Sequence, residues 1–262
     1  MSELAFEVRG NGFPVILLHG FPMNRQVWFG FAGKLANHFK IYTVDLPGFG
    51  ESPAMAAPFS IDQVAKKVLD WIEEQAITKS VLIGHSLGGY VALAMTEQAP
   101  QKFTAIGLFH STAWADTQQK KQSRDKVIEF VNTNGAVAFT SNFIAPLFAD
   151  QHHPAIPMVR ELSASATVQA VTGYTRAMRD RPDRTSVLKS FTRPILFIAG
   201  EKDAGIPVES LQHQAAQCLY PELHILKNVG HMGMVEDENQ TLQMVRAFIE
   251  KNQKLSFAIF DF

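Results

Sequence analysis

Six short, nearly uniformly apolar segments recur along this chain and constrain its fold more than any other feature. They are PVILLHG at 14–20, KIYTVDLPG at 40–48, SVLIGHS at 80–86, TAIGLFH at 104–110, RPILFIAG at 193–200 and ELHILKN at 222–228. Their apolar residues run nearly without interruption instead of alternating with polar ones, which is typical of strands covered by helices on both faces. The sequence therefore predicts an α/β fold with a mainly parallel central sheet.

Amphipathic helical patterns fill the intervals between these segments. In residues 61–75, apolar side chains recur at the spacing of one helix face, and Ser60 stands where an N-cap is expected. Residues 238–252 repeat this pattern, and residues 87–100 continue the third apolar segment as a further helix. Strands that alternate with helices favour a sheet flanked by helices within one α/β domain.

One long stretch interrupts this alternation. Between residues 111 and 190 no segment has a convincing strand pattern. Three segments in it are typical of helices: 118–134, 136–150 and 166–180. We expect residues 111–190 to form a helical cap insertion over the sheet. The core domain would then comprise residues 1–110 and 191–262.

The composition indicates a globular protein with one substantial core. The 262 residues are 46% hydrophobic and 19% charged, which suits one large domain better than two. A formal net charge of −1 provides no basic field for nucleic acid, and no apolar run approaches the ~18 residues that a membrane span requires. The first residues, MSELAFEVRGNG, lack the basic stretch and apolar run of a secretory signal, so we expect a cytoplasmic protein.

Three smaller features concern metals and partners. Cys218 is the single cysteine of the sequence, which excludes an intrachain disulfide and a metal site built from cysteine pairs. We expect it to be a small buried residue on a helix. His152 and His153 are expected to be solvated, because no nearby acid or third histidine has helical ligand spacing. The apolar tail LSFAIFDF at 255–262 would dock on the body of the protein or pair with a second copy in a homo-oligomer.

The segment IGHSLGGY at 83–90 contains the pattern G-x-S-x-G around Ser86. Because this pattern fixes only three positions, it occurs by chance in roughly one such sequence in twenty. The neighbouring segments must therefore decide whether Ser86 is a nucleophile. That context fits, because a buried strand pattern ends at the serine and a helix pattern follows it. Gly84 and Gly88 remove side chains that would collide around a strained turn. Ser86 is thus a candidate nucleophile at a helix N-terminus, where the amide of Leu87 would stabilise an oxyanion.

A serine is a weak nucleophile at its ordinary pKa and needs a base. His231 is the candidate, because it lies on a glycine-flanked loop between the last strand pattern and the last helix pattern. Its acidic partner is expected after the preceding strand, where Asp203 stands in GEKD. Glu201 in the same loop and Asp116 remain alternatives. The order serine, aspartate, histidine is that of the α/β-hydrolase triad.

A second oxyanion donor is expected in the segment LLHGFPMN at 17–24, where the amide of Phe21 is the candidate. With this loop, the sequence resembles the α/β-hydrolase superfamily over nearly all its length. HGFP matches the oxyanion loop of that family, DLPGFGES the turn after its fourth strand, GHSLGG its nucleophile elbow, GEKD its acid loop and GHMGMVE its histidine loop. In length and motif style the chain is similar to small bacterial carboxylesterases and to enol-lactonases of the oxoadipate type.

The residues and the resemblance together predict hydrolysis of small to medium carboxylic esters through an acyl-enzyme, with no cofactor and no metal. Lactone opening, C–C bond hydrolysis, thioester cleavage and cofactor-free perhydrolysis by the same triad remain open, since pocket shape decides among them. A small-molecule receptor with little turnover is the alternative from a different class. The serine at position 86 argues against relatives with an aspartate nucleophile, and Phe21 after Gly20 argues against the GGG type of lipase.

The cap insertion is expected to select the substrate. The candidate pocket walls, besides Phe21, are bulky apolar residues: Trp114, Phe143, Phe148 and Met232. We therefore expect the pocket to hold an uncharged acyl or alcohol group. The arginines of the insertion are expected to face solvent, with binding of a substrate carboxylate as the alternative: Arg124, Arg160, Arg176 and Arg179. His19 and His85 flank the candidate nucleophile and are expected to support the site without reacting.

Overall fold

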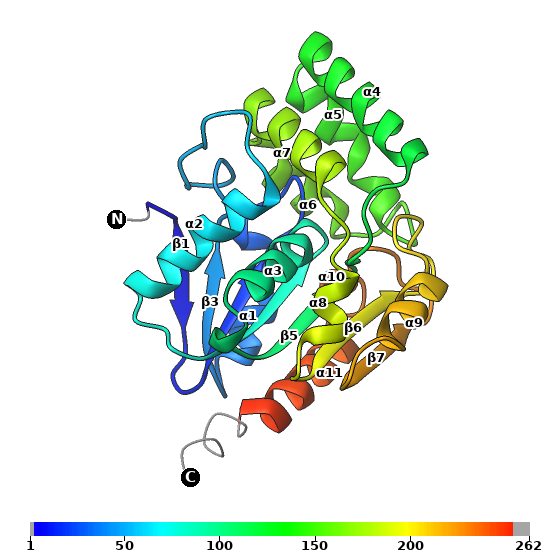
Figure 1. Cartoon of the computed structure of the whole chain (residues 1–262). Helices are drawn as coiled ribbons and strands as arrows, with labels where there is room; N and C mark the ends of the chain where they lie inside the picture. The colour runs from blue at the N-terminus through cyan, green and yellow to red at the C-terminus, as the bar shows by residue number, and fades with distance from the viewer. Residues whose placement is uncertain (1–2, 254–262) are drawn as a thin grey trace.

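The computed structural model describes residues 3–253 and contains a seven-stranded sheet flanked by helices (Figure 1). The strand order is β1-β3-β2-β4-β5-β6-β7, with β1 antiparallel to β3 and all other neighbours parallel. The strands are β1 (Phe6–Arg9), β2 (Pro14–Leu18), β3 (Lys40–Val44), β4 (Ser80–His85), β5 (Phe103–Phe109), β6 (Ile195–Gly200) and β7 (Pro221–Leu226). The predicted α/β class with a mainly parallel sheet is confirmed.

Two hydrophobic cores, one on each face of the sheet, explain the uniformly apolar segments. Successive side chains of a strand point to opposite faces, so Ile16 enters one core and Val15 the other. Outside residues 111–190, the first core receives side chains from α2 (Ile61–Glu74), α3 (Leu87–Gln98) and α9 (Val208–Ala215). The second core receives them from α1 (Phe29–Leu35), α10 (Gly233–Glu236) and α11 (Glu238–Asn252). Because both faces are covered, neither set of alternate residues can be polar.

Strand β1 was not among the predicted strands. It lies at an edge of the sheet and pairs only with β3, and none of its four residues is fully buried. A half-exposed edge strand does not need the continuous apolar run by which the other six were recognised.

Residues 111–190 contain helices and no strand. The helices are α4 (Gln118–Asn134), α5 (Ala136–Phe143), α6 (Ile156–Ala164), α7 (Val168–Asp180) and α8 (Thr185–Ser190). Figure 1 shows α4, α5, α6 and α7 grouped at one end of the molecule, beyond the carboxyl ends of the parallel strands. The predicted helix 136–150 is shorter than expected, because Pro146 disfavours helical geometry before it and a 3-10 turn follows at Ala145–Leu147. Helices α6 and α8 were not predicted.

Several local predictions can be compared with the structure. Ser60 caps α2: its hydroxyl accepts the N–H of Gln63 at 3.2 Å, and the Gln63 side chain accepts the N–H of Ser60 at 2.8 Å. Cys218 is half-buried and lies beyond the end of α9, in the turn toward β7, so its predicted place on a helix was wrong. No helix within residues 3–253 has the length and apolar character needed to cross a lipid bilayer. The tail 255–262, with its expected docking or pairing role, lies outside the described residues.

Candidate active site

Ser86 lies on the turn between β4 and α3, with φ 51° and ψ −113°. A residue with a side chain rarely adopts a positive φ, so the turn is strained. Two contacts hold it. The Ser86 N–H donates to the carbonyl of Phe109 at 2.9 Å, and the Ser111 hydroxyl donates to the carbonyl of Ser86 at 2.7 Å. The backbone is thus held on both sides while the serine itself remains partly exposed.

Close packing of α3 on the sheet explains the glycines of the motif. A Cβ on Gly84 would lie 2.2 Å from the carbonyl carbon of Gly88, and a Cβ on Gly88 would lie 2.5 Å from the carbonyl oxygen of Leu18. Neither position has room for a side chain. As a result the amide of Leu87, the first of α3, lies directly beside the serine, and it has no carbonyl of its own helix to which it could donate.

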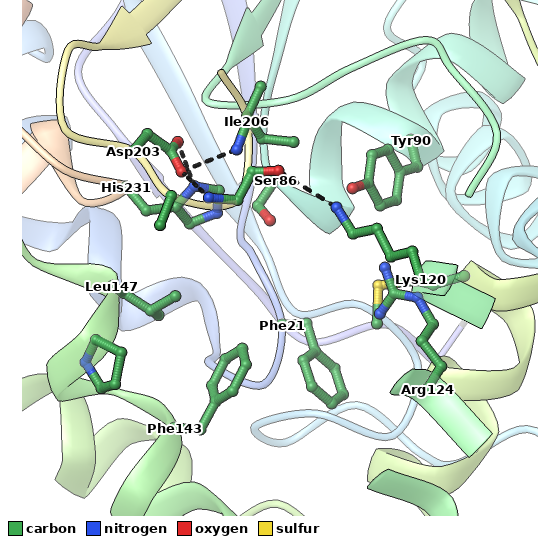
Figure 2. Close-up of a pocket in the computed structure, with 14 residues that line it drawn as sticks. Phe21, Ser86, Tyr90, Lys120, Arg124, Phe143, Leu147, Asp203, Ile206 and His231 are labelled. Atoms are coloured by element: carbon green, nitrogen blue, oxygen red, sulfur yellow. Dashed lines mark hydrogen bonds and ion pairs between the residues drawn. The ribbon is translucent and has the colours of Figure 1, made fainter. Parts of the chain in front are cut away.

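His231 and Asp203 form a hydrogen-bonded pair in the same region. The distance from His231 Nδ1 to Asp203 Oδ2 is 2.6 Å. The other carboxylate oxygen accepts the N–H groups of Gly205 and Ile206 at 2.8 and 3.0 Å. Because Nδ1 donates to a carboxylate, Nε2 of His231 is the nitrogen that remains able to accept a proton. Figure 2 shows Ser86, His231 and Asp203 together on one wall of a cavity.

The two alternative acids lie elsewhere. Glu201 accepts the N–H of Asn228 at 3.1 Å in the turn after β7, and Asp116 is buried between Arg124 and Arg181. Asp203 is the carboxylate that contacts the histidine, as the loop position predicted.

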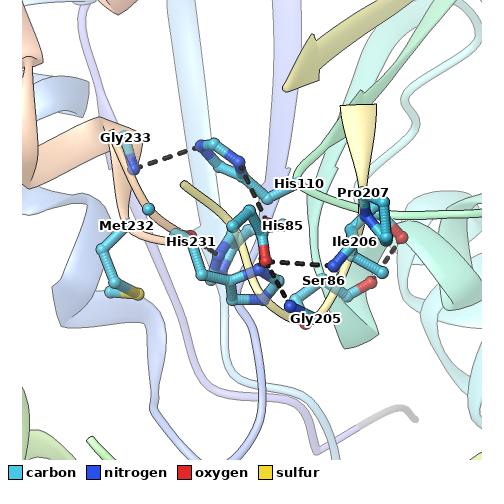
Figure 3. A network of polar contacts seen from close by, with 12 residues as sticks. His85, Ser86, His110, Gly205, Ile206, Pro207, His231, Met232 and Gly233 are labelled. Atoms are coloured by element: carbon cyan, nitrogen blue, oxygen red, sulfur yellow. Dashed lines mark hydrogen bonds and ion pairs between the residues drawn. The ribbon is translucent and has the colours of Figure 1, made fainter. Parts of the chain in front are cut away.

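A second histidine, which the sequence analysis did not single out, lies against the same carboxylate. His110 follows β5 directly and is fully buried, and its Nδ1 is 3.5 Å from Asp203 Oδ2. Its Nε2 accepts the N–H of Gly233 at 3.2 Å, which leaves the ring proton on Nδ1, facing the carboxylate (Figure 3). A histidine directly after a buried strand, at the carboxyl edge of a parallel sheet, was the signal that would have found it.

The two histidines control the charge of Asp203. Burial by itself would raise the pKa of this carboxyl group, but the charge of His231 and the polar contacts with His110 and His231 outweigh burial and hold the pKa well below its usual range. Burial lowers the pKa of His110, and the attraction of Asp203 opposes this only in part. Asp203 is therefore ionised and His110 neutral at neutral pH.

These three side chains are also the residues best placed to hold a metal among those described. The geometry does not fit one. Two ligand atoms of a tetrahedral zinc site lie roughly 3.3 Å apart, given metal–ligand distances of about 2.0–2.1 Å. The 2.6 Å between His231 Nδ1 and Asp203 Oδ2 is the length of a charge-assisted hydrogen bond. Nε2 of His110 is occupied by the Gly233 amide.

The loop after β2 lies opposite the turn that carries Ser86. His19 anchors it: its Nδ1 donates to the carbonyl of Gly20 at 2.9 Å, and its Nε2 accepts the N–H of Leu46 at 3.0 Å. Phe21, next in the chain, lines the cavity. The two contacts of His19 thus anchor the loop from which Phe21 reaches the cavity.

His85 connects this loop to the histidine loop. Its Nε2 donates to the backbone carbonyl of His231 at 2.9 Å, and a Cβ on Gly20 would lie 2.4 Å from its Nδ1. Burial lowers the pKa of His85 well below its ordinary value, and the neighbouring His231 adds to the effect. His85 is therefore a neutral packing residue, which agrees with the supporting role expected for it.

Glu236 organises the loop that carries His231. Its carboxylate accepts the N–H groups of Gly230 at 3.1 Å, Met232 at 2.9 Å and Ala149 at 2.8 Å. The last of these ties the histidine loop to residues 111–190, as does the His231 N–H, which donates to the carbonyl of Leu147 at 2.7 Å. The glutamate ends the motif GHMGMVE, and its three contacts join residues that a sequence pattern does not connect.

The cavity at Ser86 has a volume of about 190 Å³. Its lining residues are Phe21, Ser86, Tyr90, Lys120, Arg124, Phe143, Pro146, Leu147, Met178, Asp203, Ala204, Gly205, Ile206 and His231. Of the predicted walls, Phe21 and Phe143 line it. Trp114, Phe148 and Met232 do not. The walls are also not apolar on all sides, because Lys120 and Arg124 belong to them.

The three walls that were wrongly predicted pack elsewhere. Trp114 is 36% exposed and packs near His213, with ring centroids 5.9 Å apart. Phe148 is buried and stacks on His153 at 5.2 Å. Met232 is fully buried in the second core under the sheet. Apolar character alone could not tell a cavity wall from a residue that packs into the core.

The arginines named from the sequence are placed differently from one another. Arg124 lines the cavity. Arg160 is exposed, Arg176 is half-buried and Arg179 is paired with Asp125 and Asp180, so none of these three lines it. The side chain of His152 is 97% exposed, in agreement with the solvated position expected for it, whereas His153 is half-buried and stacks on Phe148.

A serine on a strained turn between strand and helix, beside a hydrogen-bonded histidine and aspartate at the carboxyl edge of a mainly parallel sheet, defines the class of hydrolases with the α/β-hydrolase fold. The chain belongs to the alpha/beta hydrolase family, whose model matches residues 15–243. It is therefore a hydrolase, and the family resemblance inferred from its motifs is confirmed.

Individual relatives agree with this assignment. The chain is 28% identical over 94% of its length to a pimeloyl-[acyl-carrier protein] methyl ester esterase of Aeromonas salmonicida, covering 99% of that protein. It is also 28% identical to the dihydrolipoyllysine-residue acetyltransferase component of an acetoin cleaving system from Pseudomonas putida. That match includes 94% of this chain, but it covers only 66% of the relative's length. Among solved structures, a thermophilic esterase from Thermogutta terrifontis has a TM-score of 0.91 at 29% identity, with 95% of this chain and 94% of that one covered.

Proposed function

We propose that this protein is a serine esterase in which Ser86, His231 and Asp203 form the catalytic triad. The observation that carries the proposal is the His231–Asp203 pair at 2.6 Å, in the cavity that also contains Ser86 on its strained turn. Esterases among the relatives support the same reaction class.

In the first step, Ser86 Oγ attacks the ester carbonyl while Nε2 of His231 accepts the serine proton. The ionised Asp203 stabilises the imidazolium that forms and keeps the proton on Nδ1 before the reaction starts. The amides of Leu87 and Phe21 donate to the oxyanion of the tetrahedral intermediate. His231 then protonates the departing alcohol, and an ester between the acyl group and Ser86 remains.

In the second step, a water molecule replaces the alcohol. Nε2 of His231 accepts a proton from the water as it attacks the acyl-enzyme carbonyl, the same amides hold the oxyanion, and the proton returns to Ser86 Oγ as the acid departs. Every proton in this sequence moves between His231 and an oxygen of Ser86, alcohol or water. The reaction needs no metal and no organic cofactor.

His110 is proposed to act as a positioning residue. Its Nδ1 faces Asp203 Oδ2, the oxygen that also pairs with His231, so it limits rotation of the carboxylate. Because Asp203 Oδ1 is already held by two amides, both oxygens of the group have fixed partners. A carboxylate held in this way keeps the His231 ring oriented toward the serine.

The size of the cavity favours small to medium esters. A volume of about 190 Å³ is below the ~300–1,000 Å³ of drug-sized ligand pockets. Phe21, Phe143 and Leu147 provide the apolar part of its wall. We propose that residues 111–190 act as the cap, since they contribute Phe143 and Leu147 and contact the histidine loop through the latter's carbonyl.

The proposal is tested with 4-nitrophenyl esters of increasing acyl length and with a fluorophosphonate probe, each applied to the wild type and to Ser86→Ala. Ser123→Ala is the matched control, because that serine is exposed on α4 and lines no part of the cavity. We expect labelling and turnover in the wild type and the control, and a loss of roughly 10⁴-fold or more in kcat for Ser86→Ala.

Other outcomes distinguish the alternatives. Full turnover by Ser86→Ala would refute the triad. Labelling of Ser86 without ester turnover would direct the search to lactone, thioester, perhydrolysis or C–C substrates, which the same groups can attack. Tight ligand binding that raises the melting temperature, with negligible turnover, would indicate a receptor.

A further inference from the structure

Two cations stand on one side of the cavity, facing the apolar wall. Lys120 and Arg124 lie one turn apart on α4 and both line the cavity together with Tyr90. Figure 2 shows them opposite Phe143 and Leu147. A charged side chain in a partly closed cavity loses part of its hydration, which is unfavourable. A ligand that carries the opposite charge compensates for this loss, and a neutral ligand does not.

The charge of Lys120 is unmatched. Its Nζ donates to the backbone carbonyl of Gly205 at 3.3 Å, and no carboxylate of residues 3–253 forms an ion pair with it. This contact brings the ammonium group to the loop that carries Asp203. The positive charge therefore lies at the cavity and not in a surface ion pair.

Arg124 is held in place and only partly neutralised. Its Nε donates to Asp116, which also accepts Arg181 at 2.7 Å, so one buried carboxylate serves two guanidinium groups. Burial would raise the pKa of Asp116, but both arginines outweigh burial and lower it, so the carboxylate is charged. The two terminal nitrogens of Arg124 have no partner within residues 3–253.

Tyr90 belongs to this wall, and Arg181 packs against it without lining the cavity. The Arg181 guanidinium lies over the Tyr90 ring, 4.0 Å from its centroid, and donates to the carbonyls of Met178 and Trp114 at 2.6 and 2.8 Å. Arg181 thus serves to hold Asp116 and Tyr90, and it is not among the residues that line the cavity. Its neighbours Lys120 and Arg124 are the groups left with donors for a ligand.

We propose that Lys120 and the terminal nitrogens of Arg124 form a subsite for a carboxylate carried by the substrate, so that the natural substrate is an anionic ester. This inference rests on the proposed esterase function and adds the charge of the substrate to it. A planar guanidinium held by Asp116 matches the two oxygens of a carboxylate, and Lys120 adds a second positive charge.

The test uses two matched pairs of chromogenic esters, one for each side of the scissile bond. On the acyl side, 4-nitrophenyl hydrogen glutarate is compared with methyl 4-nitrophenyl glutarate, after subtraction of spontaneous hydrolysis. On the alcohol side, 3-butyryloxy-4-nitrobenzoic acid is compared with its methyl ester. Within each pair only the charge and one methyl group differ. Lys120→Gln is the test variant, and Lys126→Gln, an exposed lysine on the same helix, is the matched control.

We expect the wild type to prefer the anionic member of at least one pair by roughly tenfold in kcat/KM. A hydrogen bond to a charged group typically changes a binding or rate constant by about this factor or more. Lys120→Gln should remove most of this preference, because it should lower kcat/KM for the anionic member much more than for the neutral member, while Lys126→Gln keeps both values. High salt should reduce the preference in the wild type.

Two results would overturn the inference. One is the absence of a preference for the anionic ester in both pairs. The other is an equal loss for both members of a pair in Lys120→Gln, which would show a structural role. Neither touches the esterase proposal, which fails if Ser86→Ala still hydrolyses these esters or if the wild type hydrolyses no ester at all.

Discussion

Acidification from about pH 7.5 to about pH 5.5 should destabilise this protein before its carboxylates are protonated. His19, His85 and His110 are fully buried. Burial lowers the pKa of each, most strongly for His85, because the imidazolium ion loses its hydration. Unfolding returns the rings to water, where the pKa is about 6.5. Below that pH the unfolded chain binds more protons than the folded one, so the free energy of unfolding falls as the pH falls.

The magnitude follows from proton linkage. A histidine that stays neutral in the folded state over this interval lowers the free energy of unfolding by about 1.4 kcal/mol. His85 alone therefore accounts for about 1.4 kcal/mol, and all three buried rings set an upper bound of about 4 kcal/mol. Asp203 and Asp116 do not contribute to the loss of stability in this pH interval. Their carboxyl pKa values are lowered in the folded state, and the stability that this provides is lost only below about pH 4.

Urea unfolding followed by tryptophan fluorescence at the two pH values measures this loss. In His85→Gln the side-chain amide replaces the donor that now lies 2.9 Å from the His231 carbonyl, and the titrating ring is gone. The loss of stability should then shrink by about 1.4 kcal/mol relative to the wild type. His152→Gln removes a ring that is 97% exposed and should leave the loss unchanged. Equal stability of the wild type at both pH values would refute the reasoning, as would an undiminished loss in His85→Gln.

Three further predictions concern the site. Gly84→Ala should lower the free energy of unfolding, measured in urea titrations, by about 3 kcal/mol or more, because the new Cβ would lie 2.2 Å from a backbone atom. The control Gly33→Ala, on α1, should be neutral or stabilising by up to about 1 kcal/mol. Asp203→Asn should keep the amide contacts of Oδ1 but place an N–H against His231 Nδ1, so that kcat for esters falls about 10⁴-fold; a loss below tenfold would contradict the assigned role. Phe143→Ala should raise KM for short acyl esters several-fold and Trp114→Ala should not, since only Phe143 lines the cavity; the reverse order would show that the substrate lies elsewhere.

The central part of the fold could be predicted because its signals are local. Each of β2 to β7 is a run of five to seven residues, and the apolar character of β2 to β6 reflects burial on both faces; the two helices at 61–74 and 238–252 follow the 3.6-residue period. The strained turn at Ser86 was also a local signal, since two glycines, a strand and a helix stand within a few residues of it. β1 escaped prediction because its four residues, FEVR, do not form a continuous apolar run and none of them is fully buried.

The surroundings of the site depended on contacts between distant parts of the chain. His231 and Asp203 are 28 residues apart, and loop order alone left Glu201 and Asp116 as rivals. His110 meets Gly233 across 123 residues, a contact that no window of sequence contains. The pocket walls showed the same limit. Phe143 and Phe148 stand five residues apart with the same apolar character, yet only Phe143 lines the cavity.

The sequence by itself determined the class of fold, the turn that carries Ser86 and the family, because strand burial, helix periodicity and the glycines around a strained residue are written in neighbouring positions. The tertiary structure decided which carboxylate pairs with His231, where His110 lies and which charges reach the cavity. These properties depend on where separate strands and loops end in space. Packing between distant segments sets those positions, and a linear pattern does not record them.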